Sequence, residues 1–287
     1  MIPIEQFETE HAPTWCSGCG DFAIWRALKL TLSRSALKPE ELVVVFGIGC
    51  SGNMADKLRT YCFHGLHGRA LPAAEGIKLA NHRLPVLVVA GDGDGYGEGM
   101  GHFIHTIRGN HDLTYVVHNN AVYGLTKGQT APTSQKGFET NSTPDGVIEE
   151  AVNPLALAIA AGATFVARGF SGDVHHLSDL ILAGMQHRGF ALIDVLQPCV
   201  TFNHVNTFDF FRSRVTKLET DPSHDPTDRN KAFTRALEWG DRIPIGVFYQ
   251  KEERPAYHEE LPQLAKGALV DQPLDDVDLA PLYQAFM

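Results

Sequence analysis

The stretch LPVLVVAGDGDGYGEG, residues 84–99, decides the fold of this chain. Residues 84–90 form an apolar, β-branched run that predicts a buried strand. A glycine-rich turn follows and leads into a predicted helix over residues 98–110. The turn fits neither the G-x-G-x-x-G/A dinucleotide fingerprint nor a P-loop, because its glycines stand at every second position and no Gly-Lys-Ser/Thr follows. It is not an EF-hand loop either, since the twelfth position carries no Glu.

An aspartate in this turn and two asparagines after the next strand indicate a site for phosphate and metal. Backbone N–H groups near a helix N-terminus suit a diphosphate, and Asp92 can hold a divalent cation that bridges the phosphate oxygens. The next predicted strand, residues 113–118, runs into Asn119-Asn120, which supplies further oxygen atoms. This pair of motifs resembles the thiamine diphosphate-binding signature. The alternative is a tight glycine turn and two strand-ending turn residues.

Strands and helices alternate on both sides of this stretch. The predicted strands cover residues 42–46, 84–90, 113–118, 164–168 and 190–196, and the predicted helices cover 21–34, 71–83, 98–110, 153–163 and 174–188. This alternation predicts an α/β fold, with a mainly parallel sheet covered by helices on both faces. Because ligands of open parallel sheets bind outside the carboxyl ends of the strands, we expect the segments that follow the strands to converge on one crevice.

The pattern weakens after about residue 200. Residues 121–150 and the first 20 residues read as loops, and a short helix near 230–239 and a strand near 245–250 are the remaining elements. We predict a ligand-binding domain over residues 1–202 and an irregular extension over residues 203–287 that packs on the same domain and on a partner subunit.

Composition excludes several classes of protein. The chain has 287 residues, 44% of them hydrophobic and 20% charged, which is typical of a globular protein with a full core. A net charge of −10 without a basic run argues against nucleic-acid binding. No apolar run approaches the roughly 20 residues that span a membrane, and the N-terminus carries no secretory signal. We therefore expect a soluble, cytoplasmic protein that does not enter a membrane.

Four of the five cysteines are candidate metal ligands: Cys16, Cys19, Cys50 and Cys199. In a reducing compartment they are better interpreted as ligands or free thiols than as disulfides. Zinc sites usually use two close pairs, whereas the last two of these cysteines stand alone after different strands, which favours a [4Fe–4S] cluster over zinc. The alternative is an idle Cys-x-x-Cys with two buried thiols. Cys62 has no partner at ligand spacing and is interpreted as an ordinary thiol.

Together these motifs resemble the β subunit of the 2-oxoacid:ferredoxin oxidoreductases. The resemblance runs in unbroken order over roughly residues 12–215. Besides the Gly-Asp-Gly and Asn-Asn motifs, it rests on CSGCG (16–20), GIGCSG (47–52), LHGR (66–69), IKLAN (77–81), YGLTKGQ (123–129) and QPC (197–199).

The resemblance implies roles for individual residues. The four cysteines would hold the cluster, and Mg²⁺ would be bound by Asp92, the Asn120 side chain and the Val122 carbonyl, with Asn119 only a neighbour. Thiamine diphosphate would be lined by Ile48, Gly49, Cys50, Ser51, His67, Gly93, Asp94, Gly124 and Leu125. His67 and Lys127 are the candidate catalytic residues; the alternatives are a satisfied core histidine and a solvated loop lysine.

The implied reaction is the coenzyme A-dependent oxidative decarboxylation of a 2-oxoacid to acyl-CoA and CO₂ with reduction of ferredoxin, or the reverse reductive carboxylation. The Thr-Lys-Gly-Gln sequence favours 2-oxoglutarate over pyruvate. Asn53 stands where some relatives carry a basic residue thought to assist substrate binding. Two other functions fit parts of the sequence: a non-oxidative thiamine diphosphate-dependent decarboxylase or synthase, and a zinc-stabilised binding module.

The resemblance also implies that the chain is incomplete as an enzyme. In the family, the glutamate that faces the cofactor's aminopyrimidine ring comes from the α subunit. Glu75 and Glu98 lie in segments expected on the diphosphate side of the site. A C-x₂-C-x₂-C-x₃-C ferredoxin run is missing as well. We therefore predict activity only with the α subunit, in an assembly of (αβ)₂ type.

Overall fold

The computed structural model describes residues 1–273 and 278–287 of the chain. Eight strands form one sheet: β1 (Val43–Phe46), β2 (Tyr61–His64), β3 (Val86–Gly91), β4 (Thr114–Asn119), β7 (Phe165–Phe170), β8 (Ala191–Leu196), β9 (Val215–Lys217) and β10 (Ile243–Gln250). Their order is β2-β1-β3-β4-β8-β7-β10-β9. Neighbouring strands from β2 to β7 are parallel, and β10 then pairs antiparallel with β7.

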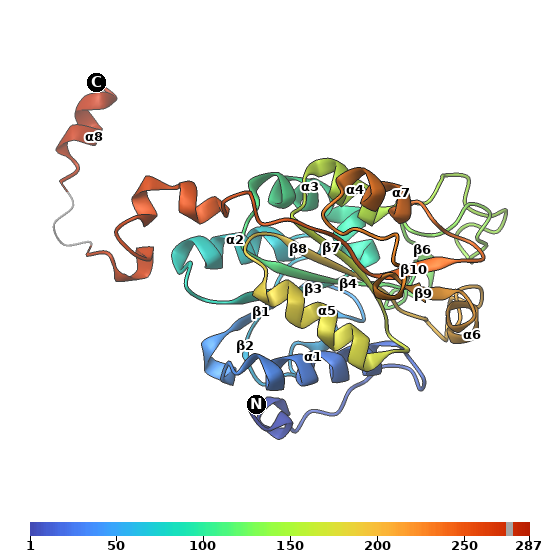
Figure 1. Cartoon of the computed structure of the whole chain (residues 1–287). Helices are drawn as coiled ribbons and strands as arrows, with labels where there is room; N and C mark the ends of the chain where they lie inside the picture. The colour runs from blue at the N-terminus through green and yellow to red at the C-terminus, as the bar shows by residue number, and fades with distance from the viewer. Residues whose placement is uncertain (274–277) are drawn as a thin grey trace.

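Helices cover both faces of the sheet (Figure 1). On one face α1 (Asp21–Ser35) packs against α5 (Val174–Gln186). On the other face lie α2 (Ala70–Ala80), α3 (Met100–Gly109), α4 (Pro154–Ala161) and α7 (Arg229–Ala236). The predicted α/β class, with a mainly parallel sheet between helices, is confirmed.

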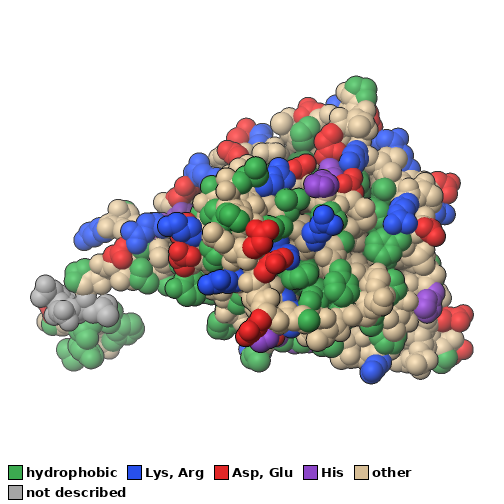
Figure 2. All heavy atoms as spheres, turned by 90° about the horizontal axis from the view of Figure 1, so that it is seen from below, with side chains coloured by type: hydrophobic (Ala, Val, Ile, Leu, Met, Phe, Trp, Pro, Cys, Tyr) green, Lys and Arg blue, Asp and Glu red, His purple; other side chains and the backbone are tan. Residues whose placement is uncertain are grey.

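The chain after β10 runs past the C-terminal ends of α3 and α4 and then leaves the body (Figure 1). Arg254 donates to the carbonyl oxygens of Ile107 (3.2 Å) and Gly162 (3.4 Å), at the ends of α3 and α4. An ion pair between Arg83 and Asp271 then holds the chain beside α2. Helix α8 (Ala280–Ala285) stands away from the sheet in Figure 1, and hydrophobic side chains gather at the end of this segment in Figure 2.

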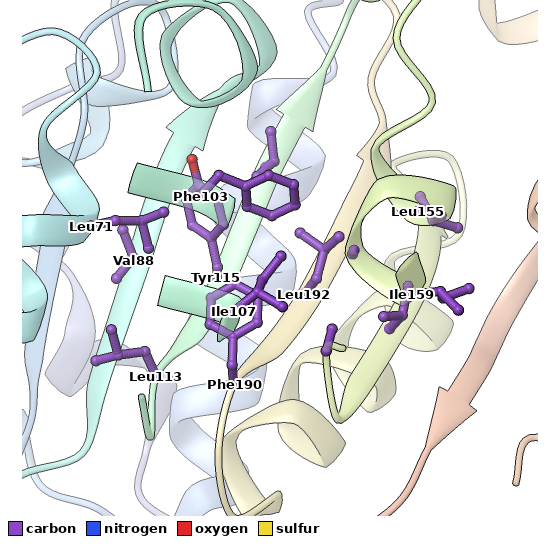
Figure 3. Close-up of a cluster of buried hydrophobic side chains, with 14 of the residues drawn as sticks. Leu71, Val88, Phe103, Ile107, Leu113, Tyr115, Leu155, Ile159, Phe190 and Leu192 are labelled. Atoms are coloured by element: carbon purple, nitrogen blue, oxygen red, sulfur yellow. The ribbon is translucent and has the colours of Figure 1, made fainter. Parts of the chain in front are cut away.

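The core forms two apolar layers, one on each side of the sheet. In the layer beneath α2, α3 and α4, the Phe103 ring lies 6.1 Å from the Tyr115 ring and 6.3 Å from the Phe190 ring, measured between centroids (Figure 3). Tyr115 and Val117 on β4 face this layer, whereas Val116 between them faces the layer beneath α1 and α5. Because its side chains alternate between the two faces, β4 is packed into both layers, and the residues that follow it are held in a defined position.

Several elements differ from the sequence-based expectations. Strand β2 is missing from them because its four residues are exposed at the sheet edge and lack a buried apolar face. Strand β9 has only three residues, and a short hairpin of β5 (Val122–Tyr123) and β6 (Gln129–Thr130) interrupts the expected loop. Residues Gly93–Glu98 form a π-helical turn, so the helix expected over 98–110 begins at Met100. Such turns occur frequently at functional sites.

Residues 203–256 contribute β9, β10 and α7 to the main body, where α7 packs on α4 and β10. The expected extension therefore continues the sheet before it becomes irregular. Within the described residues, no helix is long and apolar enough to cross a membrane.

Candidate functional site

A pocket of about 60 Å³ lies where the parallel strands β1, β3 and β4 end. All nine residues that the resemblance assigns to thiamine diphosphate line it, together with Asp92, Asn120 and Val122. The glycine turn after β3 and the asparagine pair after β4 therefore meet, because parallel strands bring their carboxyl ends to one edge of the sheet. Gln197 and Cys199, after β8, lie against the same region.

Asp92 is buried at the end of β3, with 1% of its surface exposed. Its Oδ2 atom accepts hydrogen bonds from the Ala121 amide (2.8 Å) and from the Thr133 hydroxyl. Burial raises the pKa of this carboxyl to about 7. A carboxylate that burial penalises is stabilised by a nearby cation, so Asp92 is suited to hold Mg²⁺ in this pocket.

The asparagine pair divides between two environments. Asn120 lines the pocket; its Nδ2 donates to Gln197 Oε1 (2.8 Å), and its Oδ1 accepts from the Val122 amide (3.0 Å). Asn119 lies outside the pocket and donates to Asp194 Oδ1 (3.1 Å). Among the described residues, no three His, Cys, Asp or Glu side chains converge to hold a metal ion. The predicted Mg²⁺ ligands combine one carboxylate with an amide and a backbone carbonyl, and they stay a prediction.

Four side chains that line the pocket have buried polar atoms without a hydrogen-bond partner in the described chain. These atoms are Ser51 Oγ, His67 Nδ1, Asp94 Oδ2 and His118 Nε2. Asp94 Oδ1 accepts from the Gly68 amide (2.7 Å), and His118 Nδ1 lies 2.6 Å from Asp21 Oδ1. Most buried polar atoms in proteins have a hydrogen-bond partner, so four open ones around one pocket indicate a polar ligand. A hydroxyl and an imidazole N–H can donate to a diphosphate, whereas the Asp94 carboxylate oxygen needs a cation or a donor.

His67 and Lys127 occupy different positions relative to the pocket. His67 lines its mouth, and its Nδ1 lies 3.1 Å from Asp94 Oδ1 and 3.2 Å from Glu98 Oε2. Lys127 is exposed, does not line the pocket, and has a φ of 86°. That left-handed conformation is costly for a lysine and is found mostly where the surrounding structure enforces it, often at functional sites.

Sequence reasoning missed His118, Thr133 and Tyr123. The Tyr123 hydroxyl lies 3.0 Å from the Gly93 carbonyl oxygen and 3.1 Å from Glu98 Oε2, and burial together with Glu98 raises its pKa. A Cβ atom at Gly93 would stand 2.4 Å from the Tyr123 ring, so only glycine fits there. Two features of the sequence could have indicated these residues. His118 directly precedes the asparagine pair, and Tyr123 is the first residue of the YGLTKGQ motif.

The four candidate cluster cysteines lie beside this pocket. Cys50 lines it, and a Cβ atom at Gly124 would lie 3.5 Å from Cys50 Sγ and 3.7 Å from Cys199 Sγ. Burial raises the pKa of Cys50 to about 12, and the charges of Cys199 and Cys16 contribute. Burial also raises the pKa of Cys19, with a further contribution from Asp21.

Thiols in such a setting ionise only when a cation compensates them, which is the role of iron or zinc. Because no three of the described Cys, His, Asp or Glu side chains converge on one point, the metal centre at these four cysteines stays a prediction. Cys62 lies apart on edge strand β2, where its sulfur is 3.2 Å from the Thr60 hydroxyl.

Comparison with known proteins agrees with this geometry. The family model "Thiamine pyrophosphate enzyme, C-terminal TPP binding domain" matches residues 47–195, and a model of the C-terminal part of the pyruvate ferredoxin oxidoreductase beta chain matches residues 199–266. The 2-oxoacid:ferredoxin oxidoreductase subunit beta of Saccharolobus solfataricus is 47% identical over 274 residues, covering 92% of this chain and 90% of the relative. The 2-oxoglutarate oxidoreductase subunit KorB of Mycobacterium tuberculosis is 43% identical, covering 72% and 56%.

A solved structure is similar over the whole chain. It is the 2-oxoglutarate:ferredoxin oxidoreductase from Magnetococcus marinus with 2-oxoglutarate, coenzyme A and succinyl-CoA bound, with 34% identity, a TM-score of 0.91, and coverage of 100% of this chain and 96% of that one. Fold and pocket thus define a thiamine diphosphate-binding subunit of an oxidoreductase. The chain belongs to the β subunits of the 2-oxoacid:ferredoxin oxidoreductases, which confirms the resemblance drawn from its motifs.

Proposed function

We propose that this chain holds thiamine diphosphate with Mg²⁺ and one [4Fe–4S] cluster, and that with its α subunit it converts 2-oxoglutarate and coenzyme A to succinyl-CoA and CO₂ while reducing ferredoxin. The reverse carboxylation would use the same site. The observation that carries the proposal is the position of Gly124: it lines the cofactor pocket, and a Cβ atom added to it would be in van der Waals contact with both the Cys50 and the Cys199 sulfur. The cluster would thus lie next to the cofactor, at a distance that allows direct electron transfer.

The residues of the pocket would divide the work of holding the cofactor. Asp92, Asn120 and the Val122 carbonyl would bind the cation, and the Ser51 hydroxyl would donate to the diphosphate. Hydrogen bonds from Ala121 and Thr133 fix the Asp92 carboxylate, so the cation would meet a rigid ligand. When bound, thiamine diphosphate supplies the electron sink for decarboxylation. Leu125, half-exposed at the pocket mouth, would help exclude water from the reacting atoms.

The choice of 2-oxoglutarate rests on two kinds of support. Several relatives are named 2-oxoglutarate oxidoreductase or synthase, and the solved relative contains 2-oxoglutarate and succinyl-CoA. Lys127, exposed and next to the pocket-lining residues Leu125 and Thr126, is the candidate partner for a substrate carboxylate. Its left-handed backbone would fix the direction in which the side chain leaves the loop. Pyruvate and other 2-oxoacids are the competing substrates, since other relatives are named only for 2-oxoacids.

The need for an α subunit follows from the carboxylates near the pocket. In the described chain no glutamate lines it. Glu98 lies outside the lining with Oε2 near His67 and Tyr123, and Glu75 accepts a hydrogen bond from the Thr106 hydroxyl (2.6 Å) between α2 and α3. The glutamate that activates the cofactor would then come from the α subunit, in an (αβ)₂ assembly in the cytoplasm, where the cysteine thiols stay reduced.

Anaerobic purification of the chain with its α subunit tests the proposal. We expect iron and acid-labile sulfide in equal amounts, and coenzyme A-dependent viologen reduction with kcat/KM highest for 2-oxoglutarate in a panel of 2-oxoacids. The Lys127→Ala variant should lower kcat/KM for 2-oxoglutarate by more than about tenfold, through loss of a charge-assisted hydrogen bond, without changing cofactor affinity. Lys136→Ala is the matched control, because Lys136 is exposed and paired with Glu150.

Three results would contradict the proposal in different parts. Zinc without acid-labile sulfide would contradict the assignment of an iron–sulfur cluster. Turnover by the β chain alone would remove the shared active site. A higher kcat/KM for pyruvate, together with an unchanged kcat/KM in the Lys127→Ala variant, would contradict the assignment of 2-oxoglutarate as the substrate. It would not affect the proposed cofactor site.

A further inference from the structure

A second cavity, of about 200 Å³, lies behind the cofactor pocket. Asn120 lines both cavities, and Asn119 and Thr133 line the second one only. Segments from distant parts of the chain close it: residues 151–154 before α4, the end of β8, and the C-terminal part with Phe211 and Trp239. Arg168 is the only charged residue among those that line it in the described chain.

Arg168 is buried on β7 and has an unused edge. Its Nε lies 3.4 Å from Asp194 Oδ2, and the same carboxylate accepts from Tyr96 (3.1 Å) and Asn119 (3.1 Å). The guanidinium carbon lies 5.6 Å from the ring centroids of both Trp239 and Phe248, which hold the group in place. Arg168 Nη1 is buried and has no hydrogen-bond partner in the described chain. A buried cation with a free N–H edge indicates an acceptor that has not been supplied by the protein.

A second unused donor lines the same cavity. Asn206 is 7% exposed, and its Oδ1 accepts from Asn203 Nδ2 (3.1 Å) while its own Nδ2 has no partner in the described chain. The two unpartnered buried groups of this cavity are therefore both donors. Among the residues that the structure describes, no aspartate or glutamate lines it, and Leu196, Phe211 and Trp239 form its apolar wall.

We propose that this cavity binds a small organic carboxylate. The planar guanidinium of Arg168 matches a carboxylate in shape and charge, Asn206 adds a donor, and Phe211, Leu196 and Trp239 contact the apolar body. The size agrees, because a cavity of about 150 Å³ accepts benzene and 200 Å³ leaves room for one carboxylate more. This proposal does not rest on the identity of the cofactor or substrate of the main site.

Benzoate is a suitable probe, and benzamide is its uncharged counterpart of equal shape. Calorimetric titration of the full chain should show one benzoate site, with benzamide at least tenfold weaker. The Asn206→Asp variant retains the acceptor for Asn203 but places a carboxylate oxygen where the free amide nitrogen stands. We expect it to weaken benzoate binding by at least tenfold. Asn230→Asp, the same change at an exposed position on α7, should have no effect.

Removal of the cation completes the test. Arg168→Gln alone leaves Asp194 unpaired and can prevent folding, so the double variant Arg168→Gln/Asp194→Asn removes both charges together. Its fold is checked by circular dichroism, and benzoate binding should be lost. Absence of benzoate binding to the unmodified chain at millimolar concentration, or binding unchanged in the Asn206→Asp and double variants, would overturn the proposal. Binding to the isolated chain but not to the αβ complex would overturn it as well, because the α subunit would then supply the carboxylate.

Discussion

The two edges of the parallel sheet differ in how completely their polar side chains are hydrogen-bonded within the protein. At the amino-terminal edge, the buried side chains of Asn110 and Thr164 are paired with each other and with the backbone. At the carboxyl-terminal edge, four of the side chains around the cofactor pocket keep an atom without a hydrogen-bond partner in the described chain. Both edges belong to the same strands and share the same two apolar layers, so the difference does not come from the core.

Asn110 shows how the amino-terminal edge closes on itself. Its Nδ2 donates to the carbonyl oxygens of Arg254 (3.2 Å) and Pro255 (2.9 Å), and its Oδ1 accepts from the Thr164 hydroxyl (2.9 Å) and the Phe190 amide (3.0 Å). One side chain thereby connects the end of α3, the start of β7, the start of β8 and the C-terminal segment. Among the described residues, the amide nitrogen and oxygen of Asn110 are thus both fully used within the protein.

The carboxyl-terminal edge is arranged for molecules that the chain does not contain. Ser51 Oγ, His67 Nδ1, Asp94 Oδ2 and His118 Nε2 have no hydrogen-bond partner in the described chain, and burial raises the pKa of Asp92. Each open group costs the unliganded fold free energy, of the order of 1–3 kcal/mol by general experience. We therefore expect substitutions at the amino-terminal edge to act mainly on stability and substitutions at the carboxyl-terminal edge to act mainly on binding.

The largest effect should come from the cysteines at the open edge. Changing Cys199 to Ala is expected to abolish nearly all bound iron, because a cluster corner would lose its thiolate ligand. Iron and acid-labile sulfide analysis of the anaerobically purified variant measures the loss. Cys62→Ser is the control and should keep full iron content, since Cys62 lies on β2 away from the other four. Full iron content in Cys199→Ala would remove the cysteines from the comparison.

The Asp92→Ala variant should separate binding from stability. We expect Mg²⁺-dependent affinity for thiamine diphosphate to fall about 1000-fold, about 4 kcal/mol, since the cation loses its one anionic protein ligand. The stability of the unliganded chain should change by less than about 1 kcal/mol, because the burial penalty disappears together with two hydrogen bonds. Calorimetry and chemical denaturation measure the two quantities. Asn120→Ala should weaken cofactor binding less than Asp92→Ala, and Asn119→Ala less again; a reversed order of the two asparagines would show that the ligand register is wrong.

At the amino-terminal edge we expect the opposite result, a loss of stability without a loss of cofactor binding. Asn110→Ala removes the partners of two buried donors and two carbonyl groups, and it places alanine at a φ of 53°. The free energy of unfolding should fall by about 3 kcal/mol, whereas the affinity of the folded chain for thiamine diphosphate should not change. Urea denaturation and titration at a temperature where the variant is folded test both parts. A loss of cofactor affinity as large as that of Asp92→Ala would show that the edges are coupled.

The smallest effect is expected from an exposed ion pair and depends on pH. The Ser223 hydrogen bonds, with Arg235 and Arg242 nearby, lower the pKa of Asp221 to about 2. Because this pKa lies below its ordinary value, the charged carboxylate stabilises the fold above about pH 4, and the contribution is lost as the pH falls toward 2. Asp221→Asn should therefore lower Tm slightly at pH 6 and not at pH 2. An equal difference in Tm at both pH values would assign the effect to packing.

The sequence by itself determined the class of the fold and most of the residues that line the cofactor pocket. Continuous apolar runs such as residues 84–90 require a strand buried on both faces, and the topology of parallel strands brings the segments after them to one edge. This topology alone predicts that the Gly-Asp-Gly and Asn-Asn motifs lie close together. The motifs from CSGCG to QPC added the family, because their order and identity are specific.

Only the tertiary structure decided which polar atoms stay open and which are paired. Strand β2 is exposed at the sheet edge and shows no apolar alternation. The π-helical turn Gly93–Glu98 packs closely against Tyr123, a residue outside the turn. His118 and Arg168 look like ordinary strand residues in the sequence, yet burial leaves one nitrogen of each without a partner in the described chain. Hydrogen-bond satisfaction is a property of long-range contacts, such as Arg168 with Asp194 or His118 with Asp21, and local sequence does not encode which of these contacts will be completed.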